Sequence, residues 1–227
     1  SAIVTISSYT DSTISNSSAA TFKIKPVLQL TAPNNNTANV VVGGTYPITW
    51  NLPQGSAPSL KINFSTNGGK GADNTLGTAD DFPDTNPPTA AAKGGLIIAS
   101  VASGASPFTW SNISDLMTNE GVVRISKVGD TETYDDSDIF FYIKGSVTNV
   151  QIKNAVIDAP PVLPIDLPID NEKYITWDYT GSLGTINIYY STDANAPTPT
   201  WTIIPDPDGA GPRTSGAGVS VGSGGSG

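Results

Sequence analysis

The 227-residue sequence has no cysteine and no histidine, and these two absences exclude several kinds of chemistry. Without cysteine the chain can form neither a disulfide nor a thiolate metal site. Without histidine it lacks the most common general base and the most common ligand of transition metals. The carboxylates are left as the main candidates for a functional site.

Basic residues and long apolar runs are also scarce. Eleven lysines and arginines stand against twenty acidic residues, giving a net charge of −9. No cluster of basic residues is present, which argues against binding to nucleic acid, while the acidic balance fits solubility and cation binding. No apolar run approaches the roughly 20 residues of a membrane span, and no signal peptide is visible. The sequence begins within a strand pattern, so we expect it to be a piece of a longer protein.

The residues that are present favour strands. The chain has 23 glycines and 18 prolines, which interrupt it too often for long helices. The runs between them are rich in Val, Ile, Thr, Tyr and Phe. In residues 60–66, Leu60, Ile62 and Phe64 alternate with polar side chains, as in a strand that covers a core on one face. The sequence therefore predicts an all-β fold.

An internal repeat joins the start of the chain to its middle. Residues 4–24 align with residues 123–143 without a gap, which is typical of tandem modules. The identical pairs are Val4 and Val123, Ile6 and Ile125, Ser7 and Ser126, Asp11 and Asp130, Ser18 and Ser137, Phe22 and Phe141, and Ile24 and Ile143.

A second repeat joins the middle of the chain to its last third. YITW at 174–177 repeats PITW at 47–50, and INIYYST at 186–192 repeats the strand pattern at 60–66. Residues 201–204 also resemble the strand expected at 96–99. The predicted organisation is a closing strand pair of a preceding or donated module (1–25), a complete module (26–144) with a long insertion (67–93), the opening part of a second module (145–213), and a Gly/Ser-rich tail (214–227).

The complete module is expected to contain eight short strands and one helical turn. The turn is predicted at 111–119, where Ser114 or Asp115 can act as its N-cap. The strands are predicted at 27–31, 39–42, 46–50, 60–66, 96–101, 107–110, 122–127 and 139–143.

A resemblance to a known family rests on these motifs in this order: TAPNNN with GGTYPITW, LKINFSTNGG, FTW, and VVRISKVGDTETYDDSDIFFYI. The chain resembles the Ser/Thr-rich surface-module family named for yeast cell-wall glucan-assembly proteins, whose relatives are strung along large bacterial and archaeal surface proteins. The resemblance implies tandem immunoglobulin-like β-sandwiches of about seven strands that act as spacers in a cell envelope. It supplies no catalytic residues. The insertion at 67–93 and the Pro-rich segment at 159–169 depart from the family pattern.

Two acidic sets are candidate calcium sites, because calcium prefers six to eight oxygen ligands on a turning loop. The alternative in both cases is a solvated acidic loop. The first set is Asp73, Asp80, Asp81 and Asp84 in the insertion, and the second is Asp130, Glu132, Asp135, Asp136 and Asp138 between two strands. Asp206 and Asp208 form a weaker third candidate.

Aromatic residues and glycosylation sequons complete the candidates. Trp50, Trp110 and Trp177 are expected in the core, as is usual for a strand tryptophan of such a sandwich, with sugar stacking as the alternative; Trp201 is left open. Sequons place possible glycans at Asn16, Asn35, Asn63 and Asn112, and Asn63 is expected to face outward from its strand. Paired carboxylates also suggest a glycosidase, but no second acid across a cleft accompanies them, so we expect no enzyme.

The first functional hypothesis is therefore a structural, extracellular segment of a surface layer, filament or stalk, whose partners are copies of itself or neighbouring repeats. The alternative is a carbohydrate-binding or adhesive module that contacts cell-wall polysaccharide, and a third hypothesis is an accessory domain of a secreted hydrolase. The out-of-phase half-modules also suggest assembly by strand complementation, in which residues 1–25 of one chain complete residues 145–205 of the next.

Overall fold

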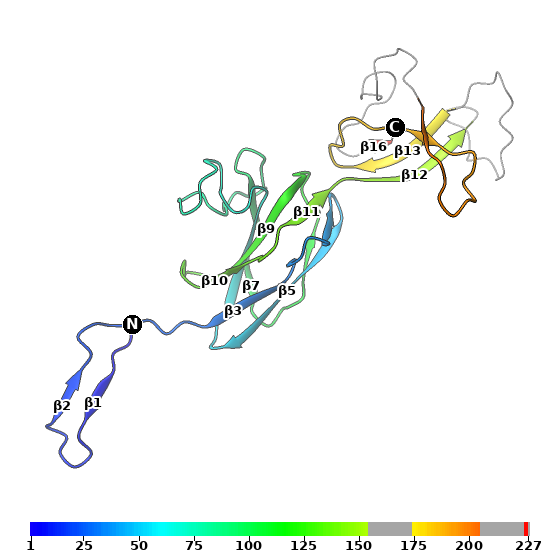
Figure 1. The fold of residues 1–227 in the computed structure, drawn as a ribbon. Coiled ribbons are helices and arrows are strands. Elements are labelled where there is room, and N and C mark those ends of the chain that lie inside the picture. The colour runs from blue at the N-terminus through cyan, green and yellow to red at the C-terminus, as the bar shows by residue number, and fades with distance from the viewer. Residues whose placement is uncertain (154–173, 205–224, 227) are drawn as a thin grey trace.

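The computed structural model describes residues 1–153, 174–204 and 225–226. The regular elements of these residues are all strands, and none of them is a helix that could cross a membrane. Figure 1 shows a protruding hairpin at the N-terminal end, a sandwich in the middle and a smaller group of strands at the C-terminal end. The all-β prediction is confirmed.

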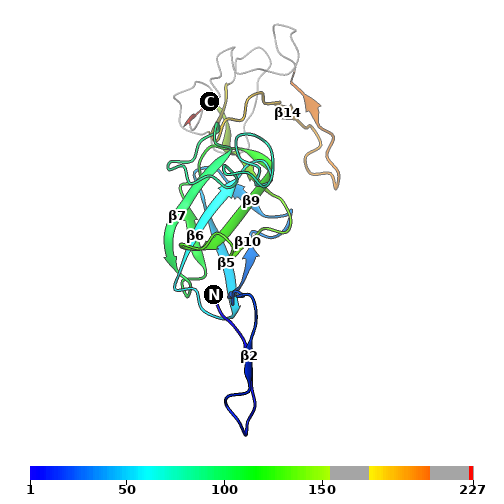
Figure 2. The ribbon, with the colours of Figure 1, turned by 90° about the vertical axis from the view of Figure 1, so that its left-hand side faces the viewer.

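The central sandwich, formed by residues 26–144, consists of two sheets that face each other (Figure 2). The larger sheet has the order β4–β11–β9–β6–β7, and the smaller sheet has the order β3–β5–β8. β10 also pairs with β9, along the same edge as β11 but at residues 124–126. The strands are β3 (Val27–Ala32), β4 (Asn39–Val41), β5 (Thr45–Gln54), β6 (Ser59–Ser65), β7 (Gly94–Ala102), β8 (Phe108–Ser111), β9 (Thr118–Lys127), β10 (Tyr134–Asp136) and β11 (Phe141–Lys144).

The core lies between the sheets and follows from the alternation along the strands. Leu60, Ile62 and Phe64 of β6 are fully buried, as the period-2 pattern predicts. The Phe64 ring lies 4.9 Å from the ring of Trp110 on the opposite sheet. The closing hairpin, named here as residues 121–143 of β9, β10 and β11, contributes four more side chains of at most 1% exposure, and these are Val123, Ile125, Phe141 and Ile143.

Two details differ from the sequence prediction. The helical turn expected at 111–119 is wrong, because the backbone of Ile113 pairs with the turn at Gly43 and Gly44 and its side chain enters the core. The short strand β10 was not expected, since Tyr134–Asp136 is polar and only half-buried. It pairs antiparallel with β9, with Asp135 opposite Ile125.

The C-terminal strands form smaller sheets. β12 (Ser146–Lys153) pairs antiparallel with β13 (Tyr174–Thr180), which also pairs with β16 (Gly225–Ser226). β14 (Tyr189–Tyr190) pairs antiparallel with β15 (Thr202–Ile203). The Pro-rich segment 159–169, the acidic pair Asp206 and Asp208 and most of the predicted tail 214–227 lie outside the described residues, and the predicted module boundaries stay predictions.

The N-terminal hairpin, defined here as residues 2–24, has two short strands, β1 (Thr5–Ser7) and β2 (Ser15–Ser17). It protrudes from the end of the central sandwich in both views (Figures 1 and 2). Every residue of β1 and β2 is exposed. The hairpin is therefore held by its own backbone pairing and not by a core.

Phe141 and its sequence counterpart Phe22 provide a matched test of this difference. Phe141 is 0% exposed, so Phe141→Ala should lower the free energy of unfolding of the central sandwich by about 3–5 kcal/mol. Phe22 is 42% exposed, so Phe22→Ala in dilute solution should lower it by less than about 1 kcal/mol. Urea unfolding followed by tryptophan fluorescence measures both. Equal losses would contradict the placement of the hairpin outside the core.

Candidate functional site

The turn between β9 and β10 is closed by Asp130. Its carboxylate accepts hydrogen bonds from the Glu132 backbone N–H at 3.0 Å and the Thr133 hydroxyl at 2.9 Å, and Lys127 lies 3.5 Å away. These donors, the backbone N–H first, lower the pKa of Asp130 to about 2. Asp130 therefore acts as the acceptor that shapes the turn.

Asp135 and Asp138, of the second acidic set, bond the closing hairpin to β3 and to the loop that follows β3. Asp135 Oδ2 accepts the Leu30 backbone N–H at 2.7 Å, and burial raises the pKa of Asp135. Asp138 and Asn34 exchange two hydrogen bonds, since Asn34 Nδ2 donates to Asp138 Oδ2 at 2.7 Å and Asn34 Oδ1 accepts the Asp138 N–H. Asp135 thus connects the two sheets of the sandwich, and Asp138 connects the loop before β11 to the loop after β3.

Asp136 pairs with Arg124, the residue opposite it on β9. Arg124 Nε and Nη2 donate to the two Asp136 carboxylate oxygens at 2.6 and 2.7 Å. The guanidinium carbon also lies 3.9 Å from the centre of the Phe82 ring and 4.0 Å from that of Tyr134. A planar cation suits this arrangement, because it forms a two-toothed ion pair and stacks on aromatic rings at the same time. Arg124 therefore fastens the insertion to the closing hairpin.

The insertion at 67–93 folds around its own acidic residues. Asp80 accepts the Asp73 backbone N–H at 3.0 Å and the Thr78 hydroxyl at 2.8 Å, and these bonds, the hydroxyl first, lower its pKa. Asp81 accepts the Gly77 N–H at 2.7 Å. Gly71 passes so close to this turn that a Cβ there would lie 2.3 Å from the Asp80 carbonyl oxygen. The acids of the loop are used by the loop itself.

Asp84 anchors the insertion to the outer face of β6. Its carboxylate pairs with Lys61 Nζ at 2.8 Å and accepts a hydrogen bond from Asn63 Nδ2 at 2.8 Å. Burial acts to raise the pKa of Asp84, but the bonds from Lys61 and Asn63 outweigh it and the pKa is lowered. Asn63 points away from the core, as expected. It is 1% exposed, because the insertion covers it, so the folded chain does not present this sequon.

The three other sequons lie on exposed positions. Asn16 is on β2, Asn35 is in the loop after β3, and Asn112 follows β8. Asn35 Oδ1 accepts both the backbone N–H and the hydroxyl of Thr37, the third residue of its sequon. Glycosylation at these three positions remains a prediction.

Neither acidic set gathers into one cluster. No group of three or more acidic side chains within the described ranges is close enough together to hold a metal ion. Each carboxylate described above instead has its own donors, on a backbone, a hydroxyl, an amide or a cation. Calcium at Asp73, Asp80, Asp81 and Asp84, or at Asp130, Asp135, Asp136 and Asp138, stays a prediction.

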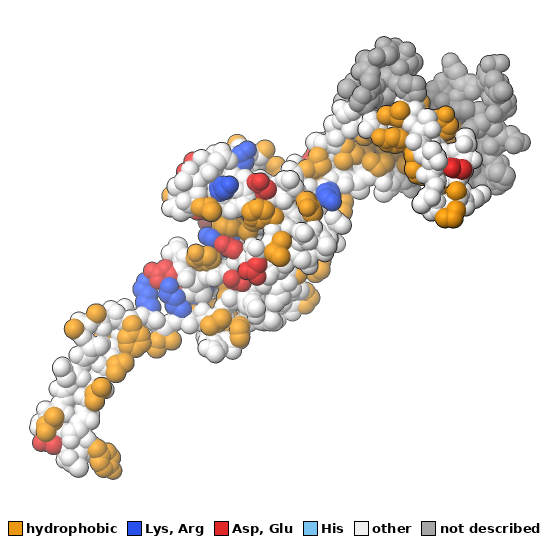
Figure 3. Space-filling model, in the orientation of Figure 1, with side chains coloured by type: hydrophobic (Ala, Val, Ile, Leu, Met, Phe, Trp, Pro, Cys, Tyr) orange, Lys and Arg blue, Asp and Glu red, His pale blue; other side chains and the backbone are white. Residues whose placement is uncertain are grey.

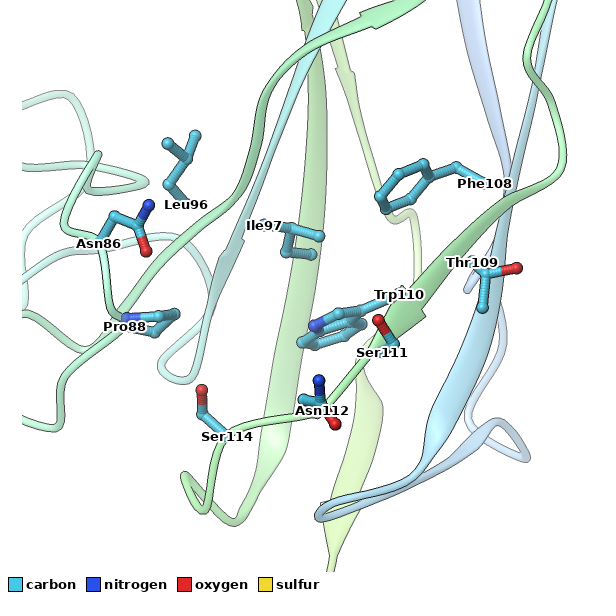
Figure 4. A pocket seen from close by; sticks show the side chains of 10 residues that line it. All are labelled: Asn86, Pro88, Leu96, Ile97, Phe108, Thr109, Trp110, Ser111, Asn112 and Ser114. Atoms are coloured by element: carbon cyan, nitrogen blue, oxygen red, sulfur yellow. The ribbon is translucent and has the colours of Figure 1, made fainter.

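Three tryptophans lie in the interior, as predicted. Trp50, Trp110 and Trp177 are at most 5% exposed, whereas Trp201 is 61% exposed. A pocket of about 180 Å³ lies beside Trp110, with Ile97 and Phe108 on its apolar side and asparagine and serine side chains around them (Figure 4). No ionisable side chain lines this pocket, so its walls offer no general acid or base.

The N-terminal hairpin reproduces the strand pairing of the closing hairpin of the central sandwich. Each of its residues corresponds to the residue 119 positions later, as Val4 corresponds to Val123. The register agrees along the ladder: Thr5 pairs with Ser17 as Arg124 pairs with Asp136, Ile6 with Asn16 as Ile125 with Asp135, and Ala2 with Phe22 as Gly121 with Phe141. A side-chain bond also recurs, since Ser18 Oγ accepts the Val4 N–H at 3.3 Å and Ser137 Oγ accepts the Val123 N–H at 3.1 Å.

The two copies differ in what covers them. The apolar residues that are buried in the closing hairpin are exposed in the N-terminal hairpin, and Figure 3 shows hydrophobic side chains along its length. These residues, named here the apolar face of the hairpin, are Val4 at 52%, Ile6 at 76%, Phe22 at 42% and Ile24 at 82% exposure. This unpartnered face is the strongest candidate for a functional surface.

One carboxylate joins the N-terminal hairpin to the central sandwich. Glu132 pairs with Lys23 Nζ at 2.5 Å and with Lys25 Nζ at 2.6 Å. The two lysines lower the pKa of Glu132, and Glu132 raises that of Lys23. The sequence carried a signal for this contact in two lysines just before Pro26, which sequence reasoning did not use, and Arg124 was likewise missed.

No family model, curated protein or solved structure matches the chain. The repeats within the chain and the contacts of its side chains are therefore the basis for assigning a function.

Arg124 is expected to be worth more than an ordinary surface cation. Arg124→Lys removes the second hydrogen bond and the stacking, and should lower the free energy of unfolding of the central sandwich by about 1–2 kcal/mol. A double-mutant cycle with Asp136→Asn, measured by urea unfolding, should give a coupling energy of about 1 kcal/mol or more. A matched control is Lys93→Arg, for which the structure gives no ion pair among the described residues. Additive losses at Arg124 and Asp136 would contradict the pairing.

The ion pairs of Glu132 with Lys23 and Lys25 predict that the orientation of the hairpin on the central sandwich depends on salt and pH. Because the folded-state pKa of Glu132 is lowered, its contribution is present above pH 4.5 and is lost as pH falls through the lowered pKa. Spin labels on Thr10→Cys and Thr37→Cys should give one narrow distance distribution at low salt. Glu132→Gln, about 1 M NaCl or a fall in pH through the lowered pKa of Glu132 should broaden it.

The exposed Glu120 provides the control for this measurement, and Glu120→Gln should leave the distribution narrow. A distribution that stays narrow in Glu132→Gln would show that another contact orients the hairpin.

Proposed function

We propose that the chain is a structural segment of an extracellular surface protein, such as a surface layer, filament or stalk, built from tandem immunoglobulin-like modules. The observation that carries the proposal is the recurrence of one closing hairpin at residues 2–24 and 121–143, with the same register of strand pairing. A repeated half-module is what an array contains and what a single-domain enzyme does not need.

The contacts at both ends of the central sandwich support a spacer role. At one end Glu132 holds Lys23 and Lys25. At the other end Asp115 accepts hydrogen bonds from the backbone N–H and the hydroxyl of Ser182. At both ends, ion pairs or hydrogen bonds therefore restrain the central sandwich against its neighbour, in addition to the covalent link. The N-terminal hairpin, the central sandwich and the C-terminal strands follow one another along one direction (Figure 1). A restrained end-to-end arrangement suits a load-bearing stalk.

Carbohydrate binding is the second candidate and has less support. Stacking on sugars needs exposed aromatic rings, and Trp50, Trp110 and Trp177 are buried. Trp201 alone among the tryptophans is accessible, at 61% exposure. The pocket beside Trp110 offers hydroxyl and amide groups for a sugar but little exposed ring surface.

Pulling the full chain from its two ends in a single-molecule experiment tests the spacer role. The central sandwich should unfold in one cooperative event that releases about 400 Å of chain, at roughly 3.5 Å per residue of 26–144. Phe141→Ala should lower the rupture force, and Phe22→Ala should leave it unchanged. Gradual extension without a rupture event would overturn the proposal.

Affinity electrophoresis in gels that contain cell-wall polysaccharides decides between the two candidates. A spacer should migrate as it does in gels without polysaccharide. Retardation that is abolished by Trp201→Ala would replace the spacer by the carbohydrate-binding module.

A further inference from the structure

The apolar face of the N-terminal hairpin has a known complement, because the chain contains the same face in its covered form. In the central sandwich β9 lies directly beside β6, with Ile125 opposite Ile62 and Val123 opposite Phe64. All four of these side chains are 0% exposed. The cover for a hairpin of this kind is therefore a strand of the β6 type that has a free edge.

The C-terminal strands offer a strand of that type. INIYYST at 186–192 places Tyr189 where Asn63 stands and Tyr190 where Phe64 stands. β14 has an antiparallel neighbour, β15, as β6 has β7. The register of the two pairs differs, because Tyr189 lies opposite Ile203, whereas Asn63 lies opposite Leu96, the counterpart of Trp201. The alignment of β14 with β6 therefore rests on the sequence and on the antiparallel neighbour that both strands have.

Among the described residues, no strand pairs with the other edge of β14, the one that corresponds to the β9 side of β6. β15 is the only strand paired with β14 in the described part of the chain. The side chains there are exposed where their counterparts are not, since Tyr190 is 49% exposed and Phe64 is 0% exposed. Ile186 and Ile188 are half-buried, whereas Leu60 and Ile62 are fully buried. Open strand edges with apolar side chains are ready templates for another strand.

We propose that the N-terminal hairpin of one copy adds to the free edge of β14 in a second copy and completes its half-sandwich. The inference rests on the proposed modular function and names the partner surface. The pairing in the central sandwich fixes the register: Ile6 lies opposite Ile188 and Val4 opposite Tyr190, as Ile125 lies opposite Ile62 and Val123 opposite Phe64.

The geometry favours a second copy over closure within one chain. The hairpin and β14 lie at opposite ends of the molecule, with the central sandwich between them (Figure 2). Lys23 and Lys25 also hold the hairpin at its own end through Glu132. A donor at one end and an acceptor at the other form a head-to-tail contact that does not close, so the assembly grows as a chain.

Cross-linking between two variants tests the register, since the natural chain has no thiol. Ile6→Cys protein is mixed with Ile188→Cys protein under mild oxidation. Residues directly opposite each other in a ladder lie within disulfide range, so a covalent dimer should form in high yield. The matched control mixes Ile6→Cys with Tyr189→Cys. A shift of one residue turns the side chain to the other face, so its yield should be at least about tenfold lower.

A second measurement covers the case in which a cysteine variant perturbs the C-terminal strands. Sedimentation of the natural chain at increasing concentration should show a rising mass, and Val4→Asp with Ile6→Asp should abolish the rise. Tyr9→Asp is the control, because Tyr9 is fully exposed at the hairpin tip and outside the proposed contact.

Three outcomes would overturn the proposal: equal cross-linking of the two pairs, no cross-linking of either, or a mass that is constant at every concentration. The single-molecule rupture of the central sandwich does not depend on the hairpin. A normal rupture event without cross-linking would therefore refute strand donation and leave the spacer role intact.

Discussion

The central sandwich depends on the burial of one apolar stripe on its closing hairpin. Val123 and Ile125 of β9 and Phe141 and Ile143 of β11 fill the space against β6 and the smaller sheet. The same stripe in the N-terminal hairpin is solvent-exposed although its backbone ladder is intact. Backbone pairing and hydrophobic cover are thus separable in this chain: the hairpin geometry is set locally, and the core contact is made by whichever sheet lies against it.

Polar contacts decide how the closing hairpin is held once the stripe is buried. Arg124 and Asp136 form a bidentate pair between two aromatic rings, whereas Thr5 and Ser17, at the corresponding positions, share one hydrogen bond at 2.7 Å. Asp135 reaches β3, and its counterpart Asn16 has no such strand beside it. In the closing hairpin, Asp135 therefore bonds the hairpin to β3 and Asp136 bonds β10 to β9, and each accepts from its own donor.

Much of the fold could be predicted from the sequence, because alternation and proline or glycine breaks act over a few residues. The strand positions near Leu60, the buried tryptophans and the hairpin repeat all follow from such local patterns. The arrangement of the acids could not be predicted, because proximity in sequence does not fix where a carboxylate points. Asp84 points away from the other acids of the insertion and pairs with Lys61. Asn63 is covered by the insertion at 67–93, which begins just after its own strand. The prediction of a helical turn near Ser114 was wrong, because Ile113 is buried in the core and its backbone bonds Gly43 and Gly44.

The insertion at 67–93 has a consequence for how such molecules can lie beside one another. It is pinned by Asn63 and Arg124 to the outer surface of the larger sheet, the side opposite the core. The sheet of a neighbouring sandwich cannot pack directly against that surface, because the insertion covers it and keeps the two sheets apart. The larger sheets of two molecules therefore cannot stack face to face on this side.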